Sequence, residues 1–174
     1  MTRAAPCDLA ALPAVELSAA SRFRGWRVPP EVFEEATPLS VFEAAQASGH
    51  LWVAVSPAGD CVGFALVSAS GERLHLEELD VVPEHGGRGL GSALVREIER
   101  WAAAGAFTEI TLTTYRDVPW NGPLYERLGF AVVEPADLDV ELSARLAAEA
   151  ARGMSTMPRV AMRKPLSRPA GAST

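Results

Sequence analysis

The feature that most constrains this chain is a glycine-rich run at residues 86–91, Gly-Gly-Arg-Gly-Leu-Gly, between two strongly patterned segments. Before it, residues 74–82 place aliphatic side chains among charged ones and end at Pro83, a pattern typical of a strand. After it, apolar residues recur at helical spacing over residues 93–101. The run therefore predicts a turn that leads from a strand directly into an amphipathic helix.

This turn has the properties of an anion-binding site. Its glycines leave several backbone N–H groups clear of neighbouring Cβ atoms, so that these groups can point into one concavity. The helix N-terminus contributes the positive end of its dipole, and Arg88 contributes a full charge. Together these groups suit a phosphate. The alternative is a flexible connection without a ligand, which alternating glycines directly before an amphipathic helix disfavour.

Two common phosphate-binding motifs do not fit the spacing. The dinucleotide-binding fingerprint needs glycines at i, i+2 and i+5, and where the first two fit, Ser92 or Leu94 occupies the third position. A P-loop needs a Lys between its second glycine and its Ser or Thr, whereas Gly91 directly precedes Ser92. The run instead fits the pattern (Gln/Arg)-x-x-Gly-x-(Gly/Ala), except that Gly86 occupies the first position.

This pattern resembles the pyrophosphate loop of the GCN5-related N-acetyltransferases, the GNAT superfamily, which also follows a Leu-x-Val strand end and Pro-Glu. The resemblance implies acetyl-CoA as the acetyl donor, with Arg88 the candidate to compensate for the Gln or Arg missing at Gly86. The implied cofactor-binding residues are Leu79, Val81, Gly86, Gly87, Arg88, Gly89, Leu90, Gly91, Ser92 and Asn121.

The remaining segments alternate between strand-like and helix-like periodicity, which predicts an α/β fold of the α+β, mixed-sheet kind. A strand, a helix and a strand at 108–114, in that order, imply a parallel pair. The resemblance implies a GNAT-like fold, in which helices flank a central, mostly antiparallel twisted sheet with one splayed parallel pair that holds the pantetheine arm. The other expected segments are an edge strand at 2–5, a helix capped by Asp8 and interrupted at Pro13, a helical segment from Pro30 that resumes at 40–47, strands at 51–55 and 61–67, a turn at 68–72, a helix from Ser92 to near Gly105, a helix at 119–128, a strand at 130–133, a helix at 138–151 and a final strand at 159–163 beside 130–133.

Composition limits the classes of partner. The chain has 174 residues and 48% hydrophobic content, which suits one folded domain, expected at 1–164, with a disordered tail at 165–174. A net charge of −6 argues against nucleic acid and weakly favours a cationic partner. No apolar stretch suggests a membrane span or a signal core, so a cytoplasmic protein is expected. Cys7, Cys61 and three scattered histidines suggest no metal site.

Candidates for acid–base chemistry lie on the strand before the glycine run. In a regular strand His75, Glu77, Leu79 and Val81 share one face. By resemblance, the backbone N–H near Val81 binds the acetyl carbonyl, and Glu77 is the general base with His75 as its partner. A β-bulge would swap the faces and favour Glu78 instead. Alternatively, Glu77 and Glu78 form an ordinary strand surface.

A second stretch, residues 115–130, resembles the Leu-Tyr-x-x-x-Gly-Phe ending of the same superfamily at Leu124-Tyr125 and Gly129-Phe130. The resemblance makes Tyr125 the acid that protonates the leaving thiolate. The alternative is a core tyrosine under the short helix. The family's common Asn would fall at Val118, whereas Asn121 lies four residues before the tyrosine.

The resemblance predicts an N-acetyltransferase that moves the acetyl group of acetyl-CoA to a primary amine of a small molecule or peptide, by direct attack in a ternary complex. The alternatives are a non-catalytic acyl-CoA-binding sensor and a protein N-terminal or lysine acetyltransferase. Dimers are frequent in the superfamily, so a homodimer is one expected state. Candidates to line the acceptor site are Trp26, Glu31, Glu34, Glu35, Asp117 and Trp120. The favoured alternative for the first four is an ordinary solvated face, and the alternative for Trp120 is a packing residue.

Overall fold

The computed structural model describes residues 1–29 and 34–166. They divide into two compact units, Met1–Ser68 with Glu77–Arg96 and Ala69–Leu76 with Glu97–Thr174. The strand order is β1-β2-β3-β4-β5-β7-β6, and β4 (Arg73–Val81) contributes its first half to the second unit and its second half to the first. The predicted mixed sheet, mostly antiparallel with one parallel pair, is confirmed within the described residues.

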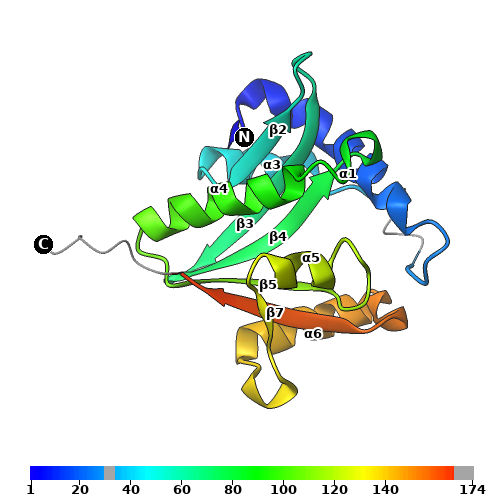
Figure 1. Cartoon of the computed structure of the whole chain (residues 1–174), viewed down its shortest axis with the longest axis vertical. Helices are drawn as coiled ribbons and strands as arrows, with labels where there is room; N and C mark the ends of the chain where they lie inside the picture. Colours follow the sequence, from blue (N-terminus) through cyan, green and yellow to red (C-terminus); the bar gives the residue numbers. More distant parts are fainter. Residues whose placement is uncertain (30–33, 167–174) are drawn as a thin grey trace, which may run out of the picture. The chain divides into compact units, whose positions relative to one another are not determined.

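The first unit is built on an antiparallel run of strands that starts at the N-terminus (Figure 1). β1 pairs with β2, as the predicted edge strand requires, and β2 pairs with β3. The elements of this unit, besides the end of β4, are β1 (Thr2–Arg3), η1 (Pro6–Ala11), α1 (Leu12–Ala20), η2 (Ser21–Phe23), α3 (Leu39–Ala47), β2 (Leu51–Val55), most of β3 (Cys61–Ser70), η3 (Pro83–His85) and the first half of α4 (Leu90–Ala104).

One hydrophobic cluster joins the helices of this unit to its strands. Leu12 and Val15 from α1 pack with Phe42 from α3 against the side chains that β2 and β3 present on one face of the sheet. Phe42 and Phe64 meet edge to face, with their ring centroids 5.3 Å apart. Such aromatic pairs contribute about 0.5–1.5 kcal/mol beyond the burial of their surface. This core fixes α1 on the sheet and thereby positions the segment that follows α1.

The second unit contains the parallel pair. Residues 73–76 of β4 pair with residues 109–112 of β5 (Glu109–Tyr115), and this is the only β4–β5 pairing within the described residues, although both strands continue. β7 (Arg159–Pro165) pairs antiparallel with the whole of β5, and β6 (Ala131–Val132) pairs with β7. α6 (Val140–Ala151) packs beside β7 and β5 (Figure 1). The other elements of this unit are the end of α4, α5 (Gly122–Arg127), η4 (Pro135–Asp137) and η5 (Met154–Thr156).

Several boundaries differ from the sequence-based expectation. Asp8 was wrongly predicted to be an N-cap, because it lies inside η1 and its carboxylate accepts the Ala5 N–H at 2.8 Å. β3 extends to Ser70, so the turn before β4 is shorter than predicted, and α4 begins at Leu90 rather than Ser92. The predicted short helix contracts to α5. Pro165 ends β7 instead of starting a tail, while the predicted helical residues 30–33 and the tail residues 167–174 lie outside the described residues.

Asp139 caps the N-terminus of α6 and also takes part in an ion-pair network. Its carboxylate accepts the Leu142 N–H at 2.9 Å as the helix N-cap and also pairs with Arg73 at 2.6 Å. Arg73 in turn bonds Glu109 on β5 at 2.6 Å. The hydrogen bond from Leu142, followed by the contacts with Arg73 and Arg163, lowers the pKa of Asp139.

Replacing Asp139 by Ala is expected to destabilise the protein by about 1–2 kcal/mol, because a cap and an ion pair are lost together. The lowered pKa means that this contribution is present at neutral pH and disappears as the pH falls below about 4, where the carboxylate becomes protonated. Urea unfolding of the wild type and variant at pH 7 and pH 3 checks both statements. Asp137→Ala, at an exposed position in η4, is the control and should change little. An equal loss in both variants would contradict the assignment.

Candidate functional site

The glycine run connects η3 to α4 in the first unit and adopts the expected turn. Gly87 and Gly89 have positive φ angles of 70° and 78°, and a Cβ built at either position would meet no atom within 4 Å. These left-handed conformations favour glycine, and the missing side chains leave the backbone open on that side. The turn can therefore bring main-chain N–H groups close to a ligand.

α4 begins immediately after this turn, with Ala93 N–H donating to the Gly89 carbonyl at 2.9 Å. The N–H groups of the first helical turn have no acceptor within a helix, so Leu90, Gly91 and Ser92 present donors at the positive end of the dipole. Arg88 is exposed beside them. The residues predicted to bind the diphosphate, 86–92, thus form one continuous turn, the proposed anion-binding turn.

Leu79 and Val81 lie against the same helical turn. A Cβ built at Gly91 would lie 3.7 Å from Leu79 Cδ2 and 4.0 Å from Val81 Cγ2. The strand end and the helix start are therefore in contact, with room for no more than a small side chain at position 91. Strand alternation then directs Glu78 and Asp80 to the opposite face of β4 from Leu79 and Val81.

On that opposite face, β4 carries carboxylates that interact with one on α1. Burial, and then repulsion from Glu78 and Glu16, raises the pKa of Asp80 well above its ordinary range. Asp80 Oδ2 is buried and makes no hydrogen bond within the described residues. Burial also raises the pKa of Glu16, although this carboxylate accepts the Thr37 N–H and hydroxyl, both at 2.9 Å. Sequence reasoning missed Glu16 and Asp80, since no local pattern connects α1 with β4.

Glu77, the predicted base, is held by the neighbouring strand. The Ser68 hydroxyl on β3 donates to Glu77 Oε1 at 2.5 Å, in a partly buried environment. This bond fixes the orientation of the carboxylate. Glu77 belongs to the first unit together with the anion-binding turn, whereas His75, Asn121 and Tyr125 belong to the second.

His75 is buried in the second unit, at the segment of β4 that pairs with β5. Its Nδ1 lies 2.9 Å from the Thr111 hydroxyl, and that hydroxyl donates to the Leu74 carbonyl at 3.2 Å. Because the single hydroxyl proton is directed to Leu74, the arrangement is satisfied when His75 Nδ1 carries a proton and donates. Thr111 therefore fixes the orientation of the imidazole.

Tyr125 lies on α5 and is largely buried. Its ring packs edge to face on Phe130, with centroids 5.7 Å apart, and Gly129 ends the helix with φ of 88°, as predicted. Asn121 precedes α5, and its side chain makes no capping hydrogen bond. Val118, which occupies the position of the family's common Asn, is 1% exposed, so in this chain that position serves the core.

The predicted acceptor residues belong to both units. Trp26 is 38% exposed, and Glu34 and Glu35 are exposed, while Glu31 lies outside the described residues. In the second unit, Asp117 is exposed and pairs with Arg116 at 2.8 Å, and Trp120 is partly buried.

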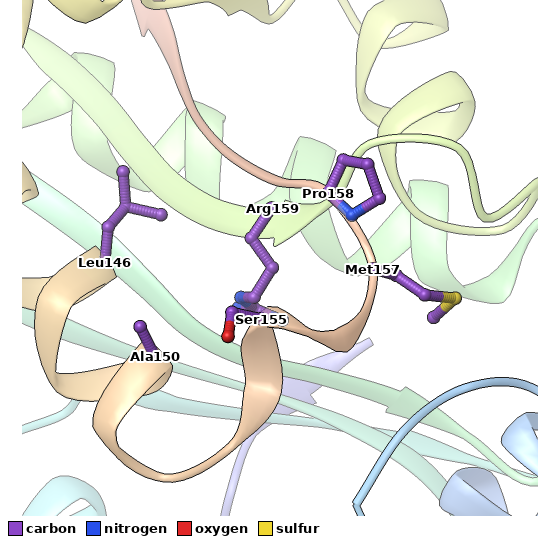
Figure 2. Close-up of a pocket in the computed structure, with 6 residues that line it drawn as sticks. All are labelled: Leu146, Ala150, Ser155, Met157, Pro158 and Arg159. Carbon is purple, nitrogen blue, oxygen red and sulfur yellow. The ribbon is translucent and has the colours of Figure 1, made fainter.

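A cavity of about 300 Å³ occurs in the second unit among α6, η5 and the start of β7 (Figure 2). Its lining is mainly apolar, and the Arg159 guanidinium at its edge is bonded to Glu149 at 2.7 and 2.8 Å. None of the predicted site residues lines this cavity. Its lining residues are Leu146, Ala150, Ser155, Met157, Pro158 and Arg159.

Comparison with known proteins identifies the family. Residues 18–130, more than half of the chain, match the Acetyltransferase (GNAT) family. The chain therefore belongs to this family, and the resemblance of its glycine run is confirmed.

Individual relatives cover the chain to different extents. Streptothricin acetyltransferase of Streptomyces lavendulae is 36% identical over an alignment of 98 residues, and the match covers 51% of this chain. The chain spans about half of that relative's length, 48%. Nourseothricin acetyltransferase has a solved structure that is 29% identical, with a TM-score of 0.52, and the match covers 67% of this chain and 65% of that one.

The PaiA N-acetyltransferase of Thermoplasma acidophilum, solved in complex with coenzyme A, shares the fold with a TM-score of 0.71 and 18% sequence identity. The match covers 94% of this chain and 96% of that one.

In the part of the chain that the structure describes, no helix is long and apolar enough to cross a membrane. The same residues contain no group of three or more His, Cys, Asp or Glu side chains that could hold a metal ion.

Replacing Asp80 by Asn is expected to stabilise the protein at neutral pH. The fold favours the neutral form of Asp80, so its contribution to stability is full at low pH and is lost as the pH rises through the pKa in the folded protein. The amide stays neutral throughout, so the variant should melt roughly 2–4 °C above the wild type at pH 8 and at the same temperature at acidic pH. Thermal unfolding from pH 4 to pH 8 measures this, with Asp60→Asn in the exposed hairpin turn as control. A variant less stable than the wild type at pH 8 would contradict the raised pKa.

Proposed function

We propose that this protein transfers the acetyl group of acetyl-CoA to a primary amine of a small molecule. The observation that carries the proposal is the anion-binding turn, in which two left-handed glycines open the backbone directly before the first turn of α4. Membership of the Acetyltransferase (GNAT) family supports the reaction class. In the net reaction an N–C bond forms at the amine, the C–S bond of the thioester breaks, and one proton passes from the amine to the thiolate.

The anion-binding turn suits the diphosphate of acetyl-CoA. The positions of the missing Cβ atoms at Gly87 and Gly89 are open, so phosphate oxygens can approach the backbone N–H groups there. Ser92 follows in the first turn of α4, and Arg88 adds a charge at the exposed rim. Farther along the chain, Asn121 has a side chain not used for capping and is proposed to bond the cofactor arm.

Acetyl-CoA supplies an activated thioester, and the residues of this chain have three proposed tasks. Glu77, oriented by Ser68, accepts a proton from the attacking amine directly or through water. The backbone N–H near Val81 donates to the acetyl carbonyl oxygen and stabilises the charge that develops there. Tyr125 donates a proton to the departing sulfur. His75, whose ring Thr111 orients, is the proposed partner of Glu77.

The acceptor is proposed to be cationic. The similarity to streptothricin and nourseothricin acetyltransferases supports a small-molecule amine rather than a protein N-terminus or lysine. The net charge of −6 favours the approach of a cation. Glu16, Glu78 and Asp80 also support it. Burial is the main cause of the raised pKa of Asp80, and a positive charge nearby would relieve the additional repulsion from Glu78 and Glu16.

The wider organisation is also part of the proposal. We infer a single domain over residues 1–164, a cytoplasmic protein, and no role for nucleic acid or a membrane. A homodimer is the proposed oligomeric state. A non-catalytic acyl-CoA sensor remains the second candidate, and only turnover distinguishes it from an enzyme.

Isothermal titration calorimetry with acetyl-CoA, CoA and ATP tests the cofactor. We expect micromolar binding of both CoA species and none of ATP, and at least about a tenfold loss of acetyl-CoA affinity in Gly89→Ala, since a Cβ at a positive φ distorts the turn. Gly59→Ala is the matched control, because Gly59 also has a positive φ and open space but lies in a distant hairpin turn. Equal affinities in the two variants would refute the turn as the binding site.

Glu77→Gln separates catalysis from binding. The variant keeps the hydrogen bond from Ser68 but cannot accept a proton, so kcat/KM for an amine panel, followed by thiol release, should fall at least about 10²-fold. Affinity for acetyl-CoA should stay within about twofold. Full turnover in the variant would transfer the role of base to Glu78 or His75, and no turnover of any amine by the wild type would favour the sensor.

A further inference from the structure

We propose that Arg22, delivered by η2 rather than by the glycine run, binds the diphosphate of acetyl-CoA at the start of the anion-binding turn. This assignment rests on the function proposed above. It explains how a chain with Gly86 at the first position of the motif can still place a positively charged side chain there.

The backbone conformation at Gly86 does not require glycine. Its φ of −63° and ψ of 157° are accessible to any residue, in contrast to the left-handed Gly87 and Gly89. What distinguishes Gly86 is the set of atoms around it, which includes a guanidinium from another element.

Two groups occupy the region that a side chain at position 86 would need. A Cβ built on Gly86 would lie 3.1 Å from the Pro83 carbonyl oxygen and 4.0 Å from an Arg22 guanidinium nitrogen. The first contact is tight, and the second is an ordinary van der Waals distance. The Arg22 guanidinium therefore lies beside Gly86, at the first position of the glycine run.

The fold holds Arg22 in this position through the core of the first unit. α1 is anchored by Leu12 and Val15 in the hydrophobic cluster, and η2 continues directly from its end. Arg22 itself is half-buried, and burial lowers its pKa, although an arginine stays protonated at any physiological pH. A partly desolvated guanidinium costs less to desolvate further and interacts more strongly with an anion than a fully hydrated one.

A diphosphate can be bound by two arginine side chains that come from different segments of the fold. A diphosphate carries two negative charges and presents pairs of oxygens that match the planar fork of a guanidinium. Arg88 is exposed within the run, and Arg22 approaches at Gly86, the first residue of the run. The turn would thus receive one charge from its own sequence and one from η2.

Calorimetry on the full chain tests this assignment with three variants. Arg22→Ala should weaken acetyl-CoA binding at least about tenfold, the loss expected for one charge-assisted hydrogen-bonded contact. Arg22→Lys, which keeps the charge without the fork, should fall between the wild type and Arg22→Ala. Arg24→Ala removes an exposed arginine two residues farther on and should bind within about twofold of the wild type.

Truncated donors identify the group that Arg22 contacts. The loss caused by Arg22→Ala should persist with 3′-dephospho-CoA, which retains the diphosphate, and vanish when turnover is measured with S-acetylpantetheine, which lacks it. Equal acetyl-CoA affinities in Arg22→Ala and Arg24→Ala, or an equal loss with S-acetylpantetheine, would overturn the assignment. If the wild type binds no CoA species, the proposed function itself fails, which is a different result from normal binding by both arginine variants.

Discussion

The left-handed backbone of Gly87 and Gly89 is the constraint on which the proposed site depends. These two conformations reverse the chain after β4 tightly enough for α4 to start at Leu90, so that its first-turn N–H groups lie beside the turn. Leu79 and Val81 lie next to Gly91 in the first turn of that helix. An extended or helical backbone at either glycine would displace the helix start from the strand end, and the proposed anion site would be lost with it.

Features encoded in short windows were predicted well. The parallel pairing of β4 with β5 followed from the order strand, helix, strand, and the C-terminal glycine of α5 followed from Leu-Gly-Phe. The predicted ends of helices were less accurate where the same residue type can serve either as a cap or turn residue or as a residue inside the helix. Asp8 has the chemistry of an N-cap, but it accepts the Ala5 N–H from inside η1, and Gly91 serves as a helical residue instead of the last residue of the turn.

Contacts between distant segments escaped prediction because nothing in the local sequence encodes them. Glu16 affects Asp80 only because the hydrophobic cluster brings α1 onto the sheet. The bond between Ser68 and Glu77 likewise depends on the pairing of strands, and the burial of Val118 depends on the whole second unit. The family resemblance and strand alternation therefore suggested a candidate base but not what orients it.

The guanidinium of Arg22 lies beside Gly86, the position at which the family motif usually carries Gln or Arg. If one guanidinium site can be filled either from the loop or from the end of the first helix, the two positions are exchangeable through evolution. Related chains should then divide into two groups, with a long polar side chain at one position or at the other. A motif search confined to the glycine loop would score the second group as poor matches. Their positive charge would nevertheless be retained, on a side chain from the end of the first helix instead of the loop.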